Sequence, residues 1–294
     1  VQIYGISSVN ARIVTGTRED QFIRKIIFTD KITSCTSEAF YNLQVLKDIV
    51  FPTTPLSLGQ KVFQRCLALE GIIVPQNVTI SGSYCFSNCS GLKYAVVAGN
   101  IELNCFENCS ALVKAVIGEQ SSSIPYRAFA SCTALEGISF LGTDEQWDDV
   151  TFKNYCFSQC SNLKTFNIPK NILEIPDNVF SYCTGLTNII IPDKVTKIGS
   201  SAFASCTGLS ELTIPASVTN LGGMKCLAIG SADNHATIIM KPTTPPVVNT
   251  QAFGSYVGRI IVPYGTADAY KAATNWANFA DIIEEAMEEE VLPL

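Results

Sequence analysis

The chain has 294 residues, a formal net charge of −6 and a single histidine. This acidic balance, with no basic stripe along the chain, argues against nucleic acid as a partner. Although 47% of the residues are hydrophobic, no uncharged apolar run reaches the roughly 18–20 residues of a membrane-spanning helix, so we expect no membrane span in this chain.

Residues 1–30 precede the regular pattern that fills most of the chain. Their clearest feature is an apolar run of strand composition at Ile26, Ile27 and Phe28. We therefore predict an N-terminal cap with a first strand over residues 1–30. Because the chain begins at Val1 rather than at methionine, we expect that a signal segment has been removed.

From residue 31 onward, phenylalanine recurs at a nearly fixed interval. Eight phenylalanines are separated by 23, 23, 20, 23, 28, 23 and 23 residues, at Phe40, Phe63, Phe86, Phe106, Phe129, Phe157, Phe180 and Phe203. A single packed core has no reason to repeat at a fixed period, whereas stacked units each bury the same face against a neighbour. The pattern predicts a solenoid over residues 31–263.

Within each repeat the spacing of apolar residues indicates local structure. Counting from the phenylalanine as position 0, apolar residues at +9 and +11 alternate with variable ones, as in Ile189 and Ile191 after Phe180, which predicts a strand. Proline at +12 ends the strand. Apolar residues three or four apart from −1 to +6 predict a short helical or 3₁₀ turn on the opposite wall. Each coil is thus predicted to add one short strand to a parallel sheet, about 4.8 Å from the next.

Two irregular places could carry additional chemistry. The repeat of Phe129 has five extra residues, and the loop at 144–149 holds four carboxylates and Trp147, which would suit a calcium ion or a sugar. The alternative is a longer turn in which Trp147 fills the apolar +18 position, and the repeat frame favours it. A second insertion, between Cys226 and Phe253, carries the only histidine, His235.

Residues 264–294 change to an alanine-rich, helical composition. Tyr270, Trp276 and Phe279 could cover the last coil of the solenoid, so we predict a C-terminal helical cap. The acidic run over residues 284–290 is predicted to be a solvated tail.

The repeat unit resembles the BspA-like leucine-rich repeat. The residues that carry the resemblance are typified by AFASCTGLSELTIPASVTNLG at 202–222, and IIVPYGTADAYKAATNWANFADII at 260–283 resembles the closing segment of such proteins from gut and oral bacteria. The resemblance covers roughly residues 30–283. It implies an α/β repeat fold, a right-handed leucine-rich-repeat solenoid with caps. It also implies a surface or secreted protein of the kind linked to adhesion, host-protein binding and coaggregation.

Twelve cysteines raise the alternatives of a metal site, disulfides or a buried core. Seven stand at +3, namely Cys66, Cys89, Cys109, Cys132, Cys160, Cys183 and Cys206. The other five also occupy positions that other repeats fill with apolar residues, and a cysteine thiol behaves as a small buried hydrophobe. Equivalent side chains in a ladder point the same way, which is poor geometry for a disulfide and does not converge four ligands on zinc. The frame therefore favours core thiols, with disulfides as the alternative.

The sequence offers no catalytic constellation and no cofactor motif. A nucleophile–histidine pair would have to use His235, and no partner is placed near it by sequence. No glycine-rich phosphate loop occurs either. We therefore expect a protein that is not an enzyme and has neither a cofactor nor a metal site.

The residues at +8 and +10 flank the buried strand positions and should point outward. Four consecutive coils place valine or isoleucine at +10, where a merely solvated face would be polar, and contiguous exposed apolar area tends to mark a partner site. The alternative is that these residues only reflect strand propensity. The candidate partner-binding residues are Asp48, Val50, Ile73, Tyr94, Val96, Lys114, Val116 and Trp147.

The sequence therefore favours a secreted or cell-surface interaction protein that binds a host or bacterial surface protein through the sheet of its solenoid. A carbohydrate-binding solenoid that uses exposed aromatic residues such as Trp147 and Tyr94 is the first alternative. A structural spacer with a smooth, polar surface is the second.

Overall fold

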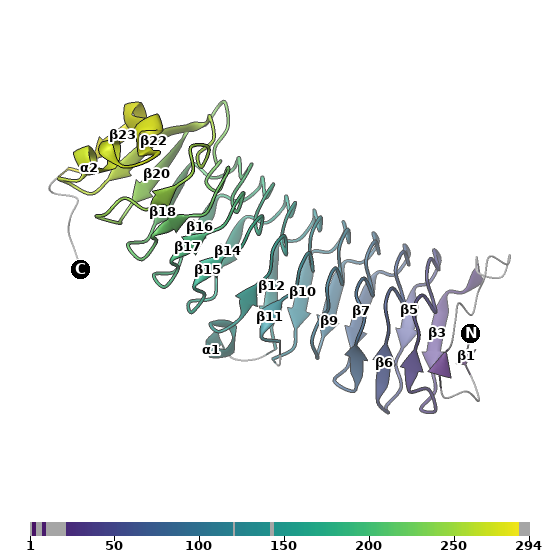
Figure 1. Ribbon diagram of the computed structural model, residues 1–294. Coiled ribbons are helices and arrows are strands. Elements are labelled where there is room, and N and C mark those ends of the chain that lie inside the picture. Colours follow the sequence, from purple (N-terminus) through teal and green to yellow (C-terminus); the bar gives the residue numbers. More distant parts are fainter. Residues whose placement is uncertain (1, 4–7, 10–21, 120, 142–143, 288–294) are drawn as a thin grey trace. The chain divides into compact units, whose positions relative to one another are not determined.

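The computed structural model describes residues 2–3, 8–9, 22–119, 121–141 and 144–287 of the chain (Figure 1). Most of the predicted N-terminal cap and the end of the predicted acidic tail, at 1, 4–7, 10–21 and 288–294, lie outside the described residues. The chain separates into two compact units. The first contains residues 1–147 and 159–161, and the second contains residues 148–158 and 162–294.

The first unit is built from short parallel strands, two to a coil in its regular part. They form the sheets β1-β3-β5, β7-β9-β10-β12 and β2-β4-β6-β8. Its elements are β1 (Gln2–Ile3), β2 (Ser8–Val9), β3 (Lys25–Phe28), β4 (Ser34–Cys35), β5 (Asp48–Val50), β6 (Leu56–Leu58), β7 (Gly71–Val74), β8 (Val78–Ile80), β9 (Tyr94–Val97), β10 (Lys114–Ile117), β11 (Ser123–Ile124), β12 (Gly137–Phe140) and the helix α1 (Asp144–Trp147).

The second unit repeats this plan and adds a helical segment. Its sheets are β14-β16, β15-β17-β19-β21 and β18-β20-β22-β23. Its elements are β13 (Thr151–Phe152), β14 (Thr165–Asn167), β15 (Glu174–Ile175), β16 (Asn188–Ile190), β17 (Lys197–Ile198), β18 (Glu211–Ile214), β19 (Asn220–Leu221), β20 (Ala236–Met240), β21 (Val247–Val248), β22 (Val257–Val262), α2 (Ala267–Ala272), the 3₁₀ helix η2 (Trp276–Ile282) and β23 (Ile283–Glu285).

The predicted strands are found in the predicted register. In β7 and β9, for example, Gly71 pairs with Tyr94 and Ile73 with Val96 in a parallel ladder. A coil commonly carries a second short strand as well, such as β6 or β8, where the sequence predicted only apolar positions. Alternating burial in both strands explains the second one, because Leu56 and Leu58 point inward while Ser57 between them does not.

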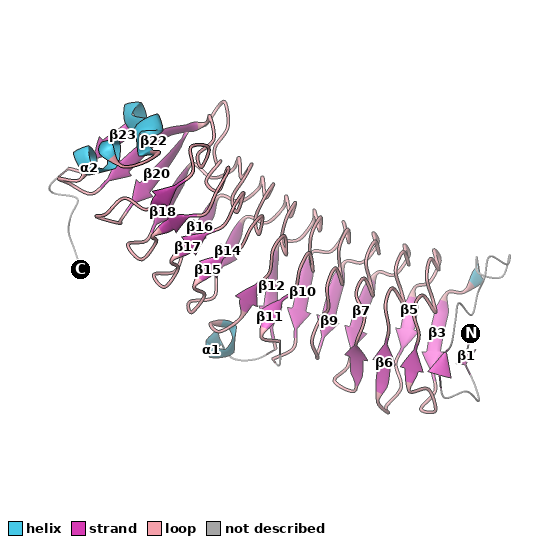
Figure 2. Cartoon of the chain, viewed as in Figure 1, coloured by secondary structure: helices cyan, strands magenta, loops and turns pink. Residues whose placement is uncertain are grey.

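The predicted helical or 3₁₀ turn of each coil is not confirmed. The residues around each phenylalanine form turns, drawn as loops in Figure 2, in which positions −2 and +2 have left-handed backbone, as at Lys61 (φ 56°) and Arg65 (φ 64°). Alternation of left- and right-handed residues cannot continue a helix. It instead aims the N–H of Phe63 at the carbonyl of Cys85 in the next coil, at 2.9 Å. We call this side of the coils the turn wall.

The phenylalanines of the repeat form a stack inside the turn wall. In the first unit, the rings of Phe40, Phe63, Phe86, Phe106 and Phe129 follow one another at centroid distances of 5.4–5.6 Å and within 10° of parallel. In the second unit, Phe180 stacks on Phe157 at 5.9 Å and on Phe203 at 5.6 Å. All of these rings are 3% exposed or less, so the repeated phenylalanine supplies a continuous core to each unit.

The cysteine at +3 has a role beyond filling space. Its thiol donates a hydrogen bond to the carbonyl oxygen of the phenylalanine in the preceding coil, as Cys109 does to Phe86 at 3.2 Å. The distance from Sγ to the oxygen is 3.1–3.5 Å in all seven cases. The same carbonyl also accepts the backbone N–H of the cysteine in its own coil, as that of Phe86 does from Cys89 at 3.3 Å, so the thiol adds a second hydrogen bond that links two coils.

The helical segment of the second unit buries two large aromatic side chains. Tyr270 and Trp276 are both fully buried. The hydroxyl of Tyr270 donates to the carbonyl of Pro242 at 2.6 Å, and Nε1 of Trp276 donates to the carbonyl of Pro246 at 2.7 Å. These bonds fix α2 and η2 against the segment that precedes β21.

The phenylalanine stack predicts a large cost for removing one ring. Phe106→Ala should lower the free energy of unfolding by about 3–5 kcal/mol, because it leaves a cavity between two stacked neighbours. The measurement is chemical denaturation. Phe22→Ala is the control, since that ring is 75% exposed and its loss should cost less than about 0.5 kcal/mol. Equal losses in the two variants would contradict the stack as the core.

Candidate functional site

The outward face of the sheet β7-β9-β10-β12 carries most of the predicted binding residues. Ile73, Val96 and Val116 lie side by side in consecutive strands, with Ser139 next in the ladder. Ile73 is 62% exposed, and Val96 and Val116 are half-buried. Contiguous apolar side chains therefore lie on a surface of the first unit. We call Ile73, Tyr94, Val96 and Val116 the apolar patch.

Burial along these strands follows the predicted alternation. The inward positions Ile72 and Val74 of β7 are at most 4% exposed, and Ala95 and Val97 of β9 at most 1%. The residues between them point to solvent because side chains alternate across a strand. Replacements on the outward face should therefore change the surface and leave the core intact.

Tyr94 lies across Gly71, its partner in the neighbouring strand. A Cβ placed on Gly71 would collide with Cζ and Cε1 of the Tyr94 ring. The ring thus occupies the space that any other residue at position 71 would fill, while 51% of Tyr94 remains exposed. The result is an aromatic ring that rests on the sheet beside Ile73. The contact between Tyr94 and Gly71 was not predicted from the sequence.

Asp48 and Val50 lie on a different sheet from the apolar patch. Both belong to β5, which pairs with β3 through Lys25 with Asp48 and Ile27 with Val50. Among the described residues, no backbone ladder joins β5 to β7. Both side chains are exposed. Val50 is the first of the predicted outward residues at +10, and it does not share a sheet with the next one, Ile73.

Trp147 stands apart from the apolar patch. It is the last residue of α1, and its ring packs on Phe140 with a centroid distance of 4.9 Å. Trp147 is half-buried, which agrees with its predicted apolar position in the repeat. Residues 142–143, which precede the loop at 144–149 that was considered for calcium or sugar, lie outside the described residues.

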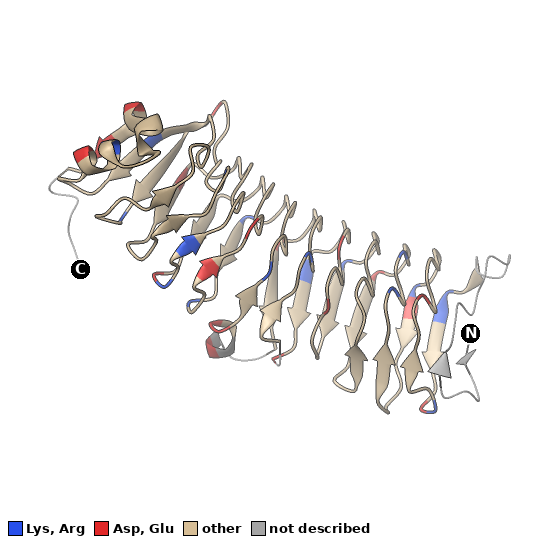
Figure 3. Ribbon diagram, viewed as in Figure 1, with Lys and Arg blue, Asp and Glu red and all other residues tan. Residues whose placement is uncertain are grey.

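Charged residues surround the sheet face without dominating it. Lys114, in register with Tyr94, is exposed, and Lys93 forms an ion pair with Glu70 at 2.9 Å. The hydrogen bond and charge of Lys93 lower the pKa of the Glu70 carboxyl. Figure 3 shows both signs of charge scattered along the coils. Charged side chains of both signs therefore lie near the apolar patch.

The cysteines are buried thiols rather than disulfides. Burial raises the pKa of the Cys35, Cys105 and Cys226 thiols to about 12, so they are protonated at neutral pH. Within the described residues, no group of three or more histidine, cysteine or acidic side chains is arranged to hold a metal ion.

His235 is exposed, and its ring lies 6.1 Å from that of Tyr256. A membrane-spanning helix is likewise not found in the part of the chain that the structure describes.

The main feature that was not predicted from the sequence is a hollow in the second unit, between β16 and β18. Both coils there have the regular 23-residue length, so the repeat frame gives no signal for it.

A family model for the BspA type leucine rich repeat region matches residues 18–136 and 99–225, with six copies of the repeat. The chain belongs to this family. The match spans the coils that carry the phenylalanine stack and the apolar patch. No curated protein matches the chain.

Solved structures of bacterial leucine-rich repeat proteins resemble this BspA-type chain. The pneumococcal vaccine antigen PcpA aligns with a TM-score of 0.52 at 16% identity, over 89% of this chain and 77% of that one. A leucine-rich repeat protein from Bacteroides ovatus aligns with a TM-score of 0.49 at 18% identity, over 97% and 88%. A leucine rich cell surface protein from Faecalibacterium prausnitzii aligns with a TM-score of 0.34 at 20% identity, over 75% and 79%. The likeness to PcpA shows the fold alone.

The buried thiols predict a loss of stability in alkaline solution. The pKa values of the Cys35, Cys105 and Cys226 thiols are raised from 9.0 to about 12, so these thiols release their protons first in the unfolded chain. The stabilisation is complete below pH 9 and is lost as pH rises toward 12. At one pH unit above the unfolded pKa, each of these three thiols should lower the free energy of unfolding by about 1.4 kcal/mol.

Denaturation curves between pH 7 and pH 10 would measure this loss. At pH 8, Ellman's reagent should label the native chain negligibly and the denatured chain at all twelve cysteines. Rapid labelling of the native chain would contradict the burial of the thiols.

The contact between Tyr94 and Gly71 predicts a local change on substitution. Gly71→Ala should displace the Tyr94 ring from the sheet, with less than about 1 kcal/mol of lost stability because the ring is free to swing into solvent. The ring proton shifts of Tyr94 in NMR spectra are the measurement. Gly137→Ala is the matched control, since a Cβ there meets nothing within 4 Å. Unchanged Tyr94 shifts in Gly71→Ala would rule out the contact.

Proposed function

We propose that this BspA-type repeat protein binds a protein partner through the outward face of the first unit's sheet, with the apolar patch at the centre of the contact. The observation that carries the proposal is the exposure of Ile73 and Tyr94 beside Val96 and Val116. Contiguous apolar and aromatic surface with a polar rim is typical of a binding site.

Family membership supports the same class of function. Leucine-rich repeat proteins typically mediate protein interaction or adhesion, and BspA-like members are generally not enzymes. We propose a host extracellular or bacterial surface protein as the partner and a secreted or cell-surface location for the chain. Lys114, Asp48 and Val50 would contribute to the rim of the contact.

A second candidate function is carbohydrate binding, and the position of Tyr94 favours it. A half-exposed aromatic ring held on the sheet by Gly71 offers a platform for the apolar face of a sugar. Trp147 is less suited to this role because its ring already packs on Phe140. A structural spacer would not need an exposed apolar patch.

The predicted organisation of the chain remains part of the proposal. Residues 1–30 and 264–294 would cap a solenoid over residues 31–263. The burial of Tyr270 and Trp276, and their bonds to the carbonyls of Pro242 and Pro246, support a covering role for the C-terminal segment.

The apolar patch predicts that two charges at its centre weaken partner binding. The double variant Ile73→Lys/Val96→Lys should bind at least about tenfold more weakly, because two lysines would have to be buried at the contact. Its melting temperature should change little, since both side chains face outward. Binding is measured by biolayer interferometry against purified extracellular matrix proteins and by adhesion to intact bacterial cells.

The matched control is Thr165→Lys/Asn167→Lys, which adds the same charges to the exposed face of β14 in the second unit. Partner binding that survives the patch variant would exclude this face. If a glycan array binds the parent chain and Tyr94→Ala abolishes that binding, carbohydrate recognition replaces the protein partner.

A further inference from the structure

The second unit has an outward sheet face of its own, formed by β16, β18, β20 and β22. Because side chains alternate across a strand, one residue near the middle of each strand points outward, namely Ile190, Thr213, Ile239 and Ile261. Thr213 pairs with Ile239, and Ile239 with Ile261, in parallel ladders. Ile190 is 77% exposed, the highest value among the isoleucines, leucines and valines of the described strands. We call these four residues the outward row.

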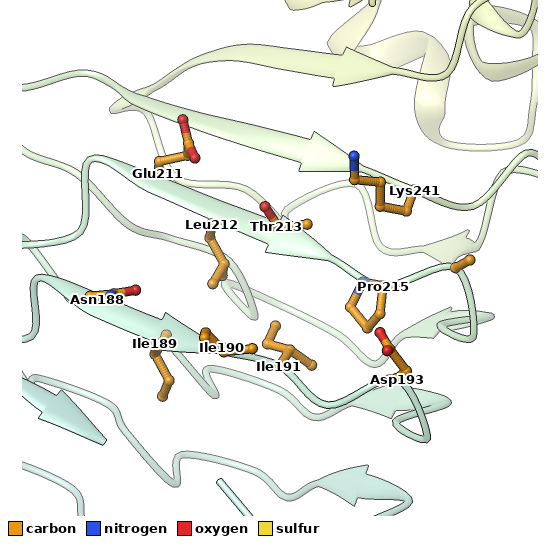
Figure 4. A pocket seen from close by; sticks show the side chains of 11 residues that line it. Asn188, Ile189, Ile190, Ile191, Asp193, Glu211, Leu212, Thr213, Pro215 and Lys241 are labelled. Carbon is orange, nitrogen blue, oxygen red and sulfur yellow. The ribbon is translucent and has the colours of Figure 1, made fainter. Parts of the chain in front are cut away.

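A hollow of about 640 Å³ lies on this face beside the outward row (Figure 4). Ile190 of β16 and Thr213 of β18 both line it. The two strands still contact each other, so the hollow is a depression in the surface and not a gap between coils. It leaves room beside Ile190 for an apolar side chain that belongs to a facing surface.

Opposite charges stand at the two ends of the strands on this face. Glu211 is the first residue of β18. Lys241 directly follows β20, and the register of β18 and β20 places it beside Pro215, about 13 Å along the strand direction from Glu211. Figure 4 shows Glu211 and Lys241 toward opposite ends. Both are exposed, and neither forms an ion pair within 4.0 Å in the described part of the chain.

This arrangement of charges is complementary to itself. A two-fold axis along the outward row would place two copies face to face with their strands antiparallel, and it would exchange the two ends of each strand. Glu211 of each copy would then lie one strand, about 4.8 Å, from Lys241 of the other, within reach of the long lysine side chain. The alternative with parallel strands would bring equal ends, and thus equal charges, together.

We propose that the chain self-associates through this face as an antiparallel two-fold dimer, with the outward row at its centre. Two ion pairs between Glu211 and Lys241 would flank the row, and the Ile190 side chains of the two copies would meet at their hollows. Asp193, which lies at the same end as Lys241 (Figure 4), would accept a hydrogen bond from the side-chain amide of Asn188 in the other copy.

The size of the face sets the expected strength of the contact. Four strands span about 14 Å across and five residues span about 13 Å along them. This area is small for a stable dimer, so the dissociation constant should be roughly 10–500 μM. The face belongs to the second unit and is separate from the apolar patch of the first, so one chain could bind a protein partner and a second copy at the same time.

Charge reversal tests the antiparallel arrangement. In sedimentation velocity between about 10 and 500 μM, the parent chain should show a monomer–dimer equilibrium. Glu211→Lys and Lys241→Glu should each weaken it at least about tenfold, because each variant sets like charges together at two places. An equimolar mixture of the two variants should recover the association, since their charges are complementary. Lys271→Glu, the same change at an exposed residue of α2, is the matched control and should associate like the parent.

A second pair of variants tests the outward row. Ile190→Lys should abolish self-association, because two lysines would face each other at the centre of the contact. The matched control is Leu173→Lys, which changes another exposed apolar residue of the second unit that is not on this face. Ile190→Lys should leave the melting temperature and the binding of a protein partner by the apolar patch unchanged. Failure of this proposal is therefore distinguishable from failure of the proposed function.

Three results would overturn the proposal. The first is a parent chain that stays monomeric at about 500 μM. The second is a mixture of Glu211→Lys and Lys241→Glu that associates no more tightly than either variant alone. The third is self-association of Ile190→Lys with the affinity of the parent.

Discussion

The fold depends on a hydrogen-bonded contact between successive coils at the turn wall. Within each unit the repeated phenylalanines stack on one another. Phe86, for example, stacks on Phe106, donates its N–H to the following coil, and accepts the thiol of Cys109 from that coil at its carbonyl. These three interactions fix the rotation of one coil on the next. The strands on the other side of the coil then lie in parallel register.

This arrangement explains why cysteine recurs at +3. The site is too enclosed for a large side chain, and a thiol there adds a hydrogen bond between coils at the second lone pair of the phenylalanine carbonyl. Alanine would fill the space without donating, and serine would bring a hydroxyl that is more costly to bury. The thiol is small, apolar and a weak donor. The left-handed residues of the turn wall cost about 1–2 kcal/mol each, and the bonds between coils offset this cost.

Because the register of the strands is set at the turn wall, the outward side chains of the strands contribute little to holding the coils together. Ile73 and Tyr94 vary the chemistry of the surface while Ile72 and Ala95 maintain the core. The same independence permits the ladder to be interrupted between β16 and β18 while the phenylalanine stack continues. The outward residues can therefore be substituted without changing the buried core, which suits a protein whose function is to bind a partner.

The sequence predicted the repeat, the first strand of each coil and the core position of the cysteines, because these follow from periodic apolar residues. The predicted helical turn is not confirmed, because apolar spacing of three or four residues also fits turns with left-handed residues at positions −2 and +2. Lys61 and Tyr84 occupy left-handed positions, and the sequence lacks the glycine that usually marks such backbone. The contact of Tyr94 with Gly71 and the hollow beside Ile190 depend on side-chain placement and sheet curvature, which the repeat frame does not encode.

Amide hydrogen exchange tests the role of the turn wall most directly. If coils are registered there, the amides of Phe63, Phe86 and Phe180, which donate to the next coil at 2.9–3.0 Å, should be among the slowest to exchange, although they lie in turns. Exchange of these amides at the rate of an unprotected peptide, with protection confined to the strands, would contradict the account.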